Sequence, residues 1–188
     1  MAELLGRRIV RSRPLGGGCL FDVQAVDLDD GRRVVVKSGA GGIPDQLAIE
    51  ARMLADLAAA GVTVPGVLAV DADRLVLDWV ANDGRGLDRA GRRILARQMA
   101  ALHDRPQPDF GYHEDTVIGA LPQPNPRRSS WIDFFREARL LGPAAAARQE
   151  GVLDAATHRR LEALALRLGD RLEEPPHPSL LHGDLWAG

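Results

Sequence analysis

The chain has 188 residues, of which 45% are hydrophobic, and its formal net charge at pH 7 is -2. It lacks the basic surplus of a nucleic-acid-binding protein, and no run approaches the roughly 18 consecutive apolar residues of a membrane-spanning helix. The single cysteine, Cys19, excludes an internal disulfide and fits a reducing compartment. We therefore expect a cytoplasmic protein with no nucleic-acid and no membrane partner.

A small antiparallel sheet is predicted for the first third of the chain. Apolar runs, alternating or rich in valine, are separated by turn residues, which is the pattern of strands and hairpins. The turn Asp29-Asp30-Gly31 joins two of these runs into a hairpin. The predicted strands start at Ile9 and then cover residues 23–28, 33–37, 67–70 and 74–80.

One helix is predicted between these strands, over residues 44–60. Pro44 suits a first helical turn, and Gly61 suits the residue that ends a helix. Four apolar residues recur at helical spacing, namely Leu47, Ala51, Leu54 and Ala58.

From about residue 90 the pattern becomes helical. A proline-rich loop is expected from Asp104 to Ser129, and loops of that length are often functional or mobile. Ser130 and Asp154 are placed to cap the helices that follow the loop. Three apolar stripes mark the helices: Leu95, Met99 and Leu102; Trp131, Phe134, Phe135 and Ala138; and Leu161, Leu164, Leu168 and Leu172. This order of elements predicts an α+β chain with two lobes, residues 1–80 and 81–188.

A glycine loop and a strand lysine are the first candidates for chemistry. Gly16, Gly17 and Gly18 stand between two predicted strands, whereas Rossmann and Walker loops lead into a helix. A glycine loop within a hairpin can close over nucleotide phosphates, although an ordinary flexible turn is the alternative. Lys37 is the only lysine of the chain and ends a valine-rich strand, so it needs a partner such as Glu50 on the following helix. The alternative for Lys37 is a side chain that reaches solvent at the strand end.

Two later stretches complete the order of a kinase. Asp78, Trp79 and Val80 end an apolar strand, where a kinase connects its lobes and holds adenine through backbone groups. His182-Gly183-Asp184 then places a carboxylate in a glycine-containing turn after a short apolar run. Such a carboxylate is suited to accept the proton of a substrate hydroxyl. Each feature alone is common, and the weight lies in their order along the chain.

These residues resemble the fructosamine (ketosamine 3-) kinase family, which belongs to the protein-kinase-like aminoglycoside phosphotransferase superfamily. The run His182 to Gly188 is similar to the HGDLWxGN signature of that family. The resemblance also covers the glycine loop with Cys19, the stretch from Phe110 to Asn125, and the helix that begins with Trp131 and carries Arg139. It implies a protein-kinase-like fold with a small antiparallel N-terminal lobe and a mainly helical C-terminal lobe.

The resemblance implies ATP-dependent phosphorylation of a sugar hydroxyl on a free or protein-bound ketosamine, with Mg²⁺, and hence protein deglycation. By match, Asp184 is the catalytic base. The nucleotide would contact Gly16, Gly17, Gly18, Lys37, Glu50, Asp78, Trp79 and Val80. The ketosamine would contact Trp186, Gln123 and Asn125.

One departure concerns the end of the signature. The family pattern continues into an asparagine, whereas this sequence ends at Gly188. The resemblance implies that this asparagine and a later aspartate, the two metal ligands, lie beyond Gly188, so no metal ligand is assigned within the chain. We expect a fragment of a longer protein with an incomplete helical lobe, and an inactive 188-residue chain on its own.

Cys19 gives a separate hypothesis. A thiol in a glycine loop over the nucleotide site is placed for oxidation or for an intermolecular disulfide. We therefore expect a monomer, with a disulfide dimer through Cys19 as a redox-dependent alternative.

Two other functions stay open on the sequence. An aminoglycoside- or choline-type phosphotransferase shares the lysine, the glutamate and the HGD turn, and differs only in its substrate pocket. A non-catalytic nucleotide-binding pseudokinase fits the missing metal ligands, but the presence of Lys37, Glu50 and Asp184 argues against it.

Overall fold

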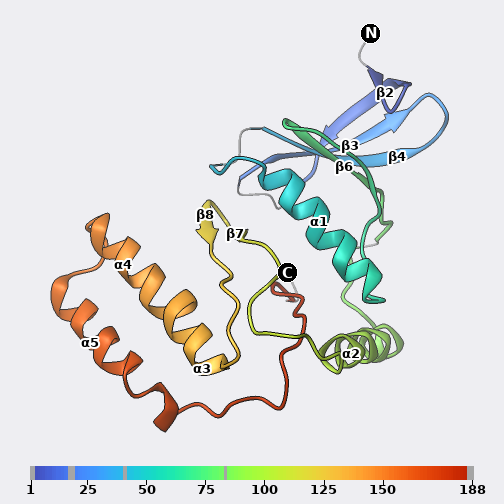
Figure 1. Cartoon of the computed structure of the whole chain (residues 1–188). Coiled ribbons are helices and arrows are strands. Elements are labelled where there is room, and N and C mark those ends of the chain that lie inside the picture. The colour runs from blue at the N-terminus through green and yellow to red at the C-terminus, as the bar shows by residue number, and fades with distance from the viewer. Residues whose placement is uncertain (1–2, 17–19, 40–41, 83, 186–188) are drawn as a thin grey trace. The chain divides into compact units, whose positions relative to one another are not determined.

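The computed structural model describes residues 3–16, 20–39, 42–82 and 84–185. Within these ranges it contains a six-stranded antiparallel sheet, a separate two-stranded hairpin and a series of helices (Figure 1). The chain divides into two compact units. The first unit comprises residues up to Leu102, residues 117–122 and the residues from His182 onward, and the second comprises residues 103–116 and 123–181.

The sheet of the first unit has the strand order β1-β2-β3-β4-β6-β5, and every neighbouring pair is antiparallel. The predicted hairpin is confirmed, because β3 pairs with β4 across the Asp29–Gly31 turn, with Asp27 opposite Arg33. The strands are β1 (Glu3–Leu4), β2 (Arg7–Pro14), β3 (Asp22–Leu28), β4 (Arg33–Ser38), β5 (Val67–Val70) and β6 (Arg74–Asp78).

Apolar side chains pack on both faces of this sheet, because successive residues of a strand point to opposite sides. On one face a buried cluster consists of Leu4, Val26, Leu28, Val34 and Val76. On the other face α1 (Gln46–Ala59) lies against the strands (Figure 1). The second cluster consists of Leu47, Ala51, Leu75 and Leu77, with Phe21, Val35 and Leu54 packed against it.

A tight turn returns β1 onto β2. Leu5 and Gly6 form a two-residue connection with positive φ values of 53° and 68°, which is the backbone of a type I′ hairpin turn. This turn lets Leu4 join the buried cluster on the face away from α1. A strand of two residues is too short to show an alternating pattern, which is why the sequence did not predict β1.

Helix α1 ends at Ala59, one residue before the predicted end, and begins at Gln46, two residues later than predicted. Asp45 precedes the helix with a left-handed φ of 58°, so Pro44 lies outside the first turn. Gly61 has a φ of 85°, and its amide donates to the carbonyl of Ala58 at 2.9 Å. This is the glycine-terminated helix end that the sequence indicated.

Helix α2 (Arg89–His103) carries the first predicted apolar stripe, and its Met99 and Leu102 are buried. The side chain of Gln98 donates to the hydroxyl of Thr63 at 2.7 Å, which ties α2 to the segment after α1. None of the helices in the described ranges is both long and apolar enough to cross a bilayer.

The second unit is built on one helical run and a second helix beside it (Figure 1). The run consists of α3 (Trp131–Phe134), the π-helical η1 (Phe135–Leu141) and α4 (Gly142–Gln149), and it is followed by α5 (Ala155–Ala165) and the short η2 (Leu168–Asp170). Both predicted caps are confirmed. The hydroxyl of Ser130 accepts from the amide of Asp133, and the carboxylate of Asp154 accepts from the amides of Ala156 and Thr157.

Two expectations for the chain after residue 103 were wrong. The leucine stripe does not continue as one helix to Leu172, because α5 ends at Ala165, whose carbonyl accepts a hydrogen bond from Arg136. The region from 104 to 129 is not a plain loop either. It contains the paired strands β7 (Thr116–Ile118) and β8 (Leu121–Gln123), and Phe110 and Arg128 form an isolated antiparallel bridge.

Candidate active site

The sheet register places Lys37 on the face that α1 covers. Lys37 lies opposite Val23 of β3 and Leu75 of β6, two residues after Val35. Val35 packs against the cluster formed with α1, and residues two apart on a strand share a face. The sequence pattern of β4 therefore directs the ammonium group toward α1.

Lys37 and Glu50 form an ion pair between β4 and α1. The Nζ atom of Lys37 donates to Oε1 of Glu50 at 2.7 Å and to Oε2 at 2.6 Å. The two side chains are 22% and 32% exposed, so the pair is partly screened from water. The Lys37 ammonium also lies 5.6 Å from the centre of the Phe21 ring, within cation–π range. The ion pair is the contact that the sequence suggested for the only lysine of the chain.

The glycine loop joins β2 to β3 in the same unit. The amide of Leu15 donates to the carbonyl of Val23 at 2.7 Å and closes the base of the loop. Gly16 follows directly. Gly17, Gly18 and Cys19 lie outside the described residues, so the nucleotide contacts and the redox role expected of them stay predictions.

The stretch from Asp78 to Val80 follows the strand next to β4. β6 ends at Asp78, two residues earlier than predicted, and the amide of Asp78 donates to the carbonyl of Gly66 at 2.9 Å. The indole of Trp79 contacts two arginine side chains through cation–π geometry. Val80 is exposed. The adenine contact expected of this stretch stays a prediction.

The HGD turn carries the candidate catalytic carboxylate. Gly183 has a φ of 85°, a conformation that favours glycine, and the amide of Asp184 donates to Nδ1 of His182 at 3.4 Å. Asp184 is exposed and groups with the first unit, which also holds Lys37 and Glu50. Trp186 lies outside the described residues.

In the second unit Asn125 is buried and its polar atoms are engaged by the protein. Its Nδ2 donates to the carbonyl of Glu114 at 2.9 Å and to the hydroxyl of Thr116 at 3.0 Å. Its Oδ1 accepts from the guanidinium of Arg139. Gln123 joins the same network, since its Oε1 accepts from the Thr116 hydroxyl at 3.0 Å. The substrate contacts expected of Gln123 and Asn125 stay predictions.

Arg139 also belongs to this network. The family resemblance included Arg139 without assigning it a role. Its guanidinium also donates to the carbonyl of Pro124 at 2.8 Å and lies 4.6 Å from the Phe134 ring centre. Burial lowers the pKa of Arg139 from its ordinary value. Carbonyl and amide oxygens hold this partly buried cation, and the network joins the backbone at Glu114 to that at Pro124.

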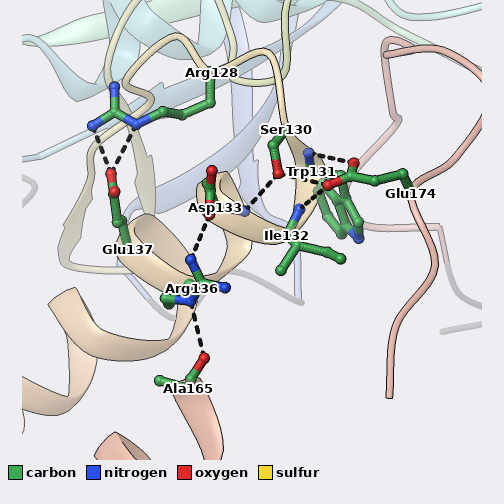
Figure 2. Close-up of polar contacts among 9 residues, drawn as sticks. All are labelled: Arg128, Ser130, Trp131, Ile132, Asp133, Arg136, Glu137, Ala165 and Glu174. Carbon is green, nitrogen blue, oxygen red and sulfur yellow. Dashed lines mark hydrogen bonds and ion pairs between the residues drawn. The ribbon is translucent and has the colours of Figure 1, made fainter. Parts of the chain in front are cut away.

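The carboxylate of Glu174 caps the start of the helical run that begins with α3 (Figure 2). Glu174 accepts from the hydroxyl of Ser130 at 2.5 Å, from the amide of Trp131 at 2.7 Å and from the amide of Ile132 at 3.2 Å. The hydrogen bond from Ser130, more than any other contact, lowers the pKa of Glu174. Glu174 therefore anchors the proline-rich segment that precedes the HGD turn in the chain.

Two further features bear on the chemistry. In the described part of the chain no three or more histidine, cysteine, aspartate or glutamate residues gather as they would around a metal ion. A shallow hollow lies beside β1 and the β5–β6 hairpin, but its lining includes Leu4 and Val76 of the cluster facing away from α1. This hollow is therefore separate from the face that carries Lys37.

The chain matches the family model described as fructosamine kinase over residues 2–188. It is 39% identical over 133 residues to "Probable ketoamine kinase YniA" of Escherichia coli K12, an alignment that covers 68% of this chain and 44% of that protein. It is 35% identical to "Probable ketoamine kinase slr1563" of Synechocystis, with 96% of this chain and 61% of that protein covered. The chain thus spans about half the length of these curated relatives.

Solved structures agree with these sequences. A Thermobifida fusca protein named "putative fructosamine-3-kinase" superposes with a TM-score of 0.83 at 30% identity, covering 97% of this chain and 64% of that one. A macrolide 2′-phosphotransferase superposes with a TM-score of 0.59 at 18% identity, covering 97% of this chain and 62% of that one. At that identity the second likeness concerns the fold alone, and together they establish the kinase-like α+β fold predicted from the sequence.

Proposed function

Because the chain belongs to the fructosamine kinase family, we propose that the protein transfers the terminal phosphoryl group of ATP to a sugar hydroxyl of a ketosamine. The ketosamine would be a fructose- or ribulose-derived adduct of a free amine or of a protein lysine. In this proposal residues 1–80 form the nucleotide-binding lobe and residues 81–188 belong to the helical lobe.

The ion pair between Lys37 and Glu50 is the observation that carries the proposal. A lysine at a strand end, held by a glutamate of the adjacent helix, is the arrangement with which kinases position the phosphates of ATP. Glu50 accepts two hydrogen bonds from Lys37 and so fixes the direction of the ammonium group. One donor of the ammonium group then remains for a phosphate oxygen.

Asp184 supplies the base in the proposed reaction. The hydroxyl oxygen of the sugar attacks the γ-phosphorus, its proton passes to the Asp184 carboxylate, and the bond to the β,γ-bridging oxygen breaks to release ADP. The His182 ring accepts a hydrogen bond from the Asp184 amide within this turn. This step relies on positioning more than on covalent chemistry.

The remaining assignments concern the two ligands. Gly16 to Gly18 would cover the phosphates, and Asp78, Trp79 and Val80 would hold adenine through the backbone. Trp186 would pack on the sugar, and Gln123 and Asn125 would shape the mouth of the substrate site. Since both Nδ2 and Oδ1 of Asn125 are engaged by protein partners, its proposed contribution is to hold this segment in shape.

ATP is the co-substrate of kinases, and Mg²⁺ neutralises the developing charge on its phosphates when it is bound. The described residues do not by themselves form the oxygen-rich cluster that a magnesium ion requires. We therefore assign no magnesium ligand among them, and no step of the proposed mechanism depends on one.

A phosphoryl-transfer assay tests this function. The protein, expressed from its complete gene as in all kinetic tests, is incubated with ATP, Mg²⁺ and one acceptor from a panel: a fructosamine, a ribulosamine, a glycated peptide, kanamycin or choline. We expect a phosphorylated ketosamine by mass spectrometry and no such product from Asp184→Asn. Transfer to kanamycin or choline in place of a ketosamine would overturn the substrate class. ATP binding without transfer to any acceptor would indicate a pseudokinase.

A further inference from the structure

Side chains on the α1 side of the sheet fall into rows across the strands, because directly paired residues point to the same face. Arg13 of β2 lies opposite Ala25 of β3, and Ala25 lies opposite Val35 of β4. Val35 in turn lies opposite Leu77 of β6. Arg13 therefore shares a face with residues that pack against α1, and with Lys37.

Asp27 of β3 and Arg33 of β4 are the next paired residues on this face, two positions along each strand from Ala25 and Val35. They form a bidentate ion pair. Nε of Arg33 lies 2.5 Å from Oδ1 of Asp27, and one terminal nitrogen lies 3.2 Å from Oδ2. This hydrogen bonding lowers the pKa of Asp27. The pair is exposed, but its fork geometry restricts the Arg33 guanidinium to one orientation.

The indole of Trp79 lies under two guanidinium groups. The central guanidinium carbon of Arg33 is 5.4 Å from the ring centre, and that of Arg13 is 5.7 Å away. Both distances are within cation–π range, and tryptophan offers the strongest such surface among the aromatic side chains. Two strands, β2 and β4, thus contribute one cation each to the same ring.

The two arginines differ in how they are paired. Arg33 is held by Asp27, whereas the part of the chain that the structure describes gives Arg13 no carboxylate within ion-pair distance. The donors of Arg13 are consequently open to a ligand. Arg13 also lies two residues before Leu15, at the base of the glycine loop.

The spacing along β4 relates the group formed by Arg13, Arg33 and Trp79 to Lys37. Arg33 and Lys37 are four residues apart on one face, which corresponds to roughly 13 Å along a strand. That span is comparable with the length of an extended nucleoside triphosphate. If Lys37 binds the phosphates, as proposed above, the group of Arg13, Arg33 and Trp79 lies toward the base end of the nucleotide.

We propose that the side chains of Arg13 and Trp79 form the outer wall of the nucleotide-base subsite, and that Arg33, fixed by Asp27, is the positioning residue that orients the indole. Flat guanidinium and indole groups are the surfaces on which proteins stack nucleobases. The inference rests on the proposed kinase function and extends it from backbone contacts to named side chains.

Calorimetry with the two halves of the nucleotide tests the inference. Adenosine reports on the base subsite and tripolyphosphate on the phosphate subsite. We expect Arg13→Ala to weaken adenosine binding about tenfold, the loss of one stacking contact, and to leave tripolyphosphate binding unchanged. Lys37→Met should do the reverse. In steady-state kinetics Arg13→Ala should raise KM for ATP and leave kcat unchanged, and Arg13→Lys should restore part of the affinity.

Arg8→Ala is the matched control, because Arg8 lies on the same strand and pairs with Asp29. It should bind both probes like the wild type. If the wild type binds ATP and adenosine but Arg13→Ala binds adenosine equally well, the inference is wrong and the kinase proposal stands. If the wild type binds neither ATP, adenosine nor tripolyphosphate, the nucleotide site itself is refuted, and the inference with it.

Discussion

Both carboxylate oxygens of Glu50 accept a hydrogen bond from the ammonium group of Lys37, at 2.7 and 2.6 Å. Because Lys37 is the only lysine in the chain, its side-chain amine has no competitor within this sequence. Acylation of a side-chain amine therefore reports on one known position of the sheet.

The first prediction uses this property. An ATP analogue with an activated acyl group on its terminal phosphate transfers the acyl group to a nearby amine and releases ATP. We expect acylation of Lys37, identified by peptide mass spectrometry, and suppression of the label by excess ATP. Lys37→Arg should remove the label. Labelling of Lys37 that ATP does not reduce would contradict a phosphate-binding role.

The second prediction concerns the energetic link between the two residues. Glu50→Gln keeps the shape of the side chain but removes the charge that orients Lys37. We expect kcat/KM for ATP to fall on the order of 100-fold, as for the loss of one preorganised electrostatic group. Lys37→Met combined with Glu50→Gln should cost little more than Lys37→Met alone, because the residues act as a unit.

Glu162→Gln is the control for charge, since Glu162 lies on α5 beside His158. Its kcat/KM should match that of the wild type. Full additivity of the Lys37 and Glu50 substitutions would refute their coupling.

The third prediction concerns the Asn125 network. Asn125→Leu leaves the Arg139 guanidinium, the Glu114 carbonyl and the Thr116 hydroxyl without one partner each. We expect a loss of about 2 kcal/mol in the free energy of unfolding, the cost of unsatisfied buried polar groups. Urea unfolding measures this loss, with Gln149→Ala at the exposed end of α4 as the control. Equal midpoints for Asn125→Leu and the wild type would show that the network contributes nothing.

Local patterns predicted the elements whose information lies within one turn or one strand. Valine-rich β4, the Asp29–Gly31 turn and the Gly61 helix end are examples, because backbone preference and alternation act over a few residues. The partner of Lys37 was also predictable, since a lone strand lysine before an amphipathic helix requires a carboxylate. In each case the residues that determine the feature lie close together along the chain.

Long-range contacts had no such signal. Glu174 lies 44 residues from Ser130, and nothing in the segment around it distinguishes it from the adjacent Glu173. Arg139 is one of many arginines, and only the fold shows that it meets Asn125. The hydrogen bond that the Ala165 carbonyl accepts from Arg136, at the end of α5, likewise joins residues of two different helices and has no signal in the local sequence.

The last prediction is the pH dependence that Glu174 contributes. Hydrogen bonds from the Ser130 hydroxyl and from two amides lower the pKa of Glu174 below its ordinary value of 4.5 in the folded state. The unfolded chain therefore binds this proton at a higher pH than the folded chain does. It follows that the stabilisation by Glu174 is complete above the unfolded value and is lost as the pH falls through the folded value.

Glu174→Gln removes the charge and keeps one carbonyl acceptor for the helix end. We expect its urea midpoint to lie below that of the wild type at pH 7, and the two midpoints to converge as the pH is lowered from 4.5. Ser130→Ala removes the largest cause of the pKa shift, so convergence should then be complete at a higher pH. The adjacent Glu173→Gln serves as the control and should follow the wild type. A midpoint difference for Glu174→Gln that is the same at pH 7 and in acid would contradict a role for the ionised carboxylate.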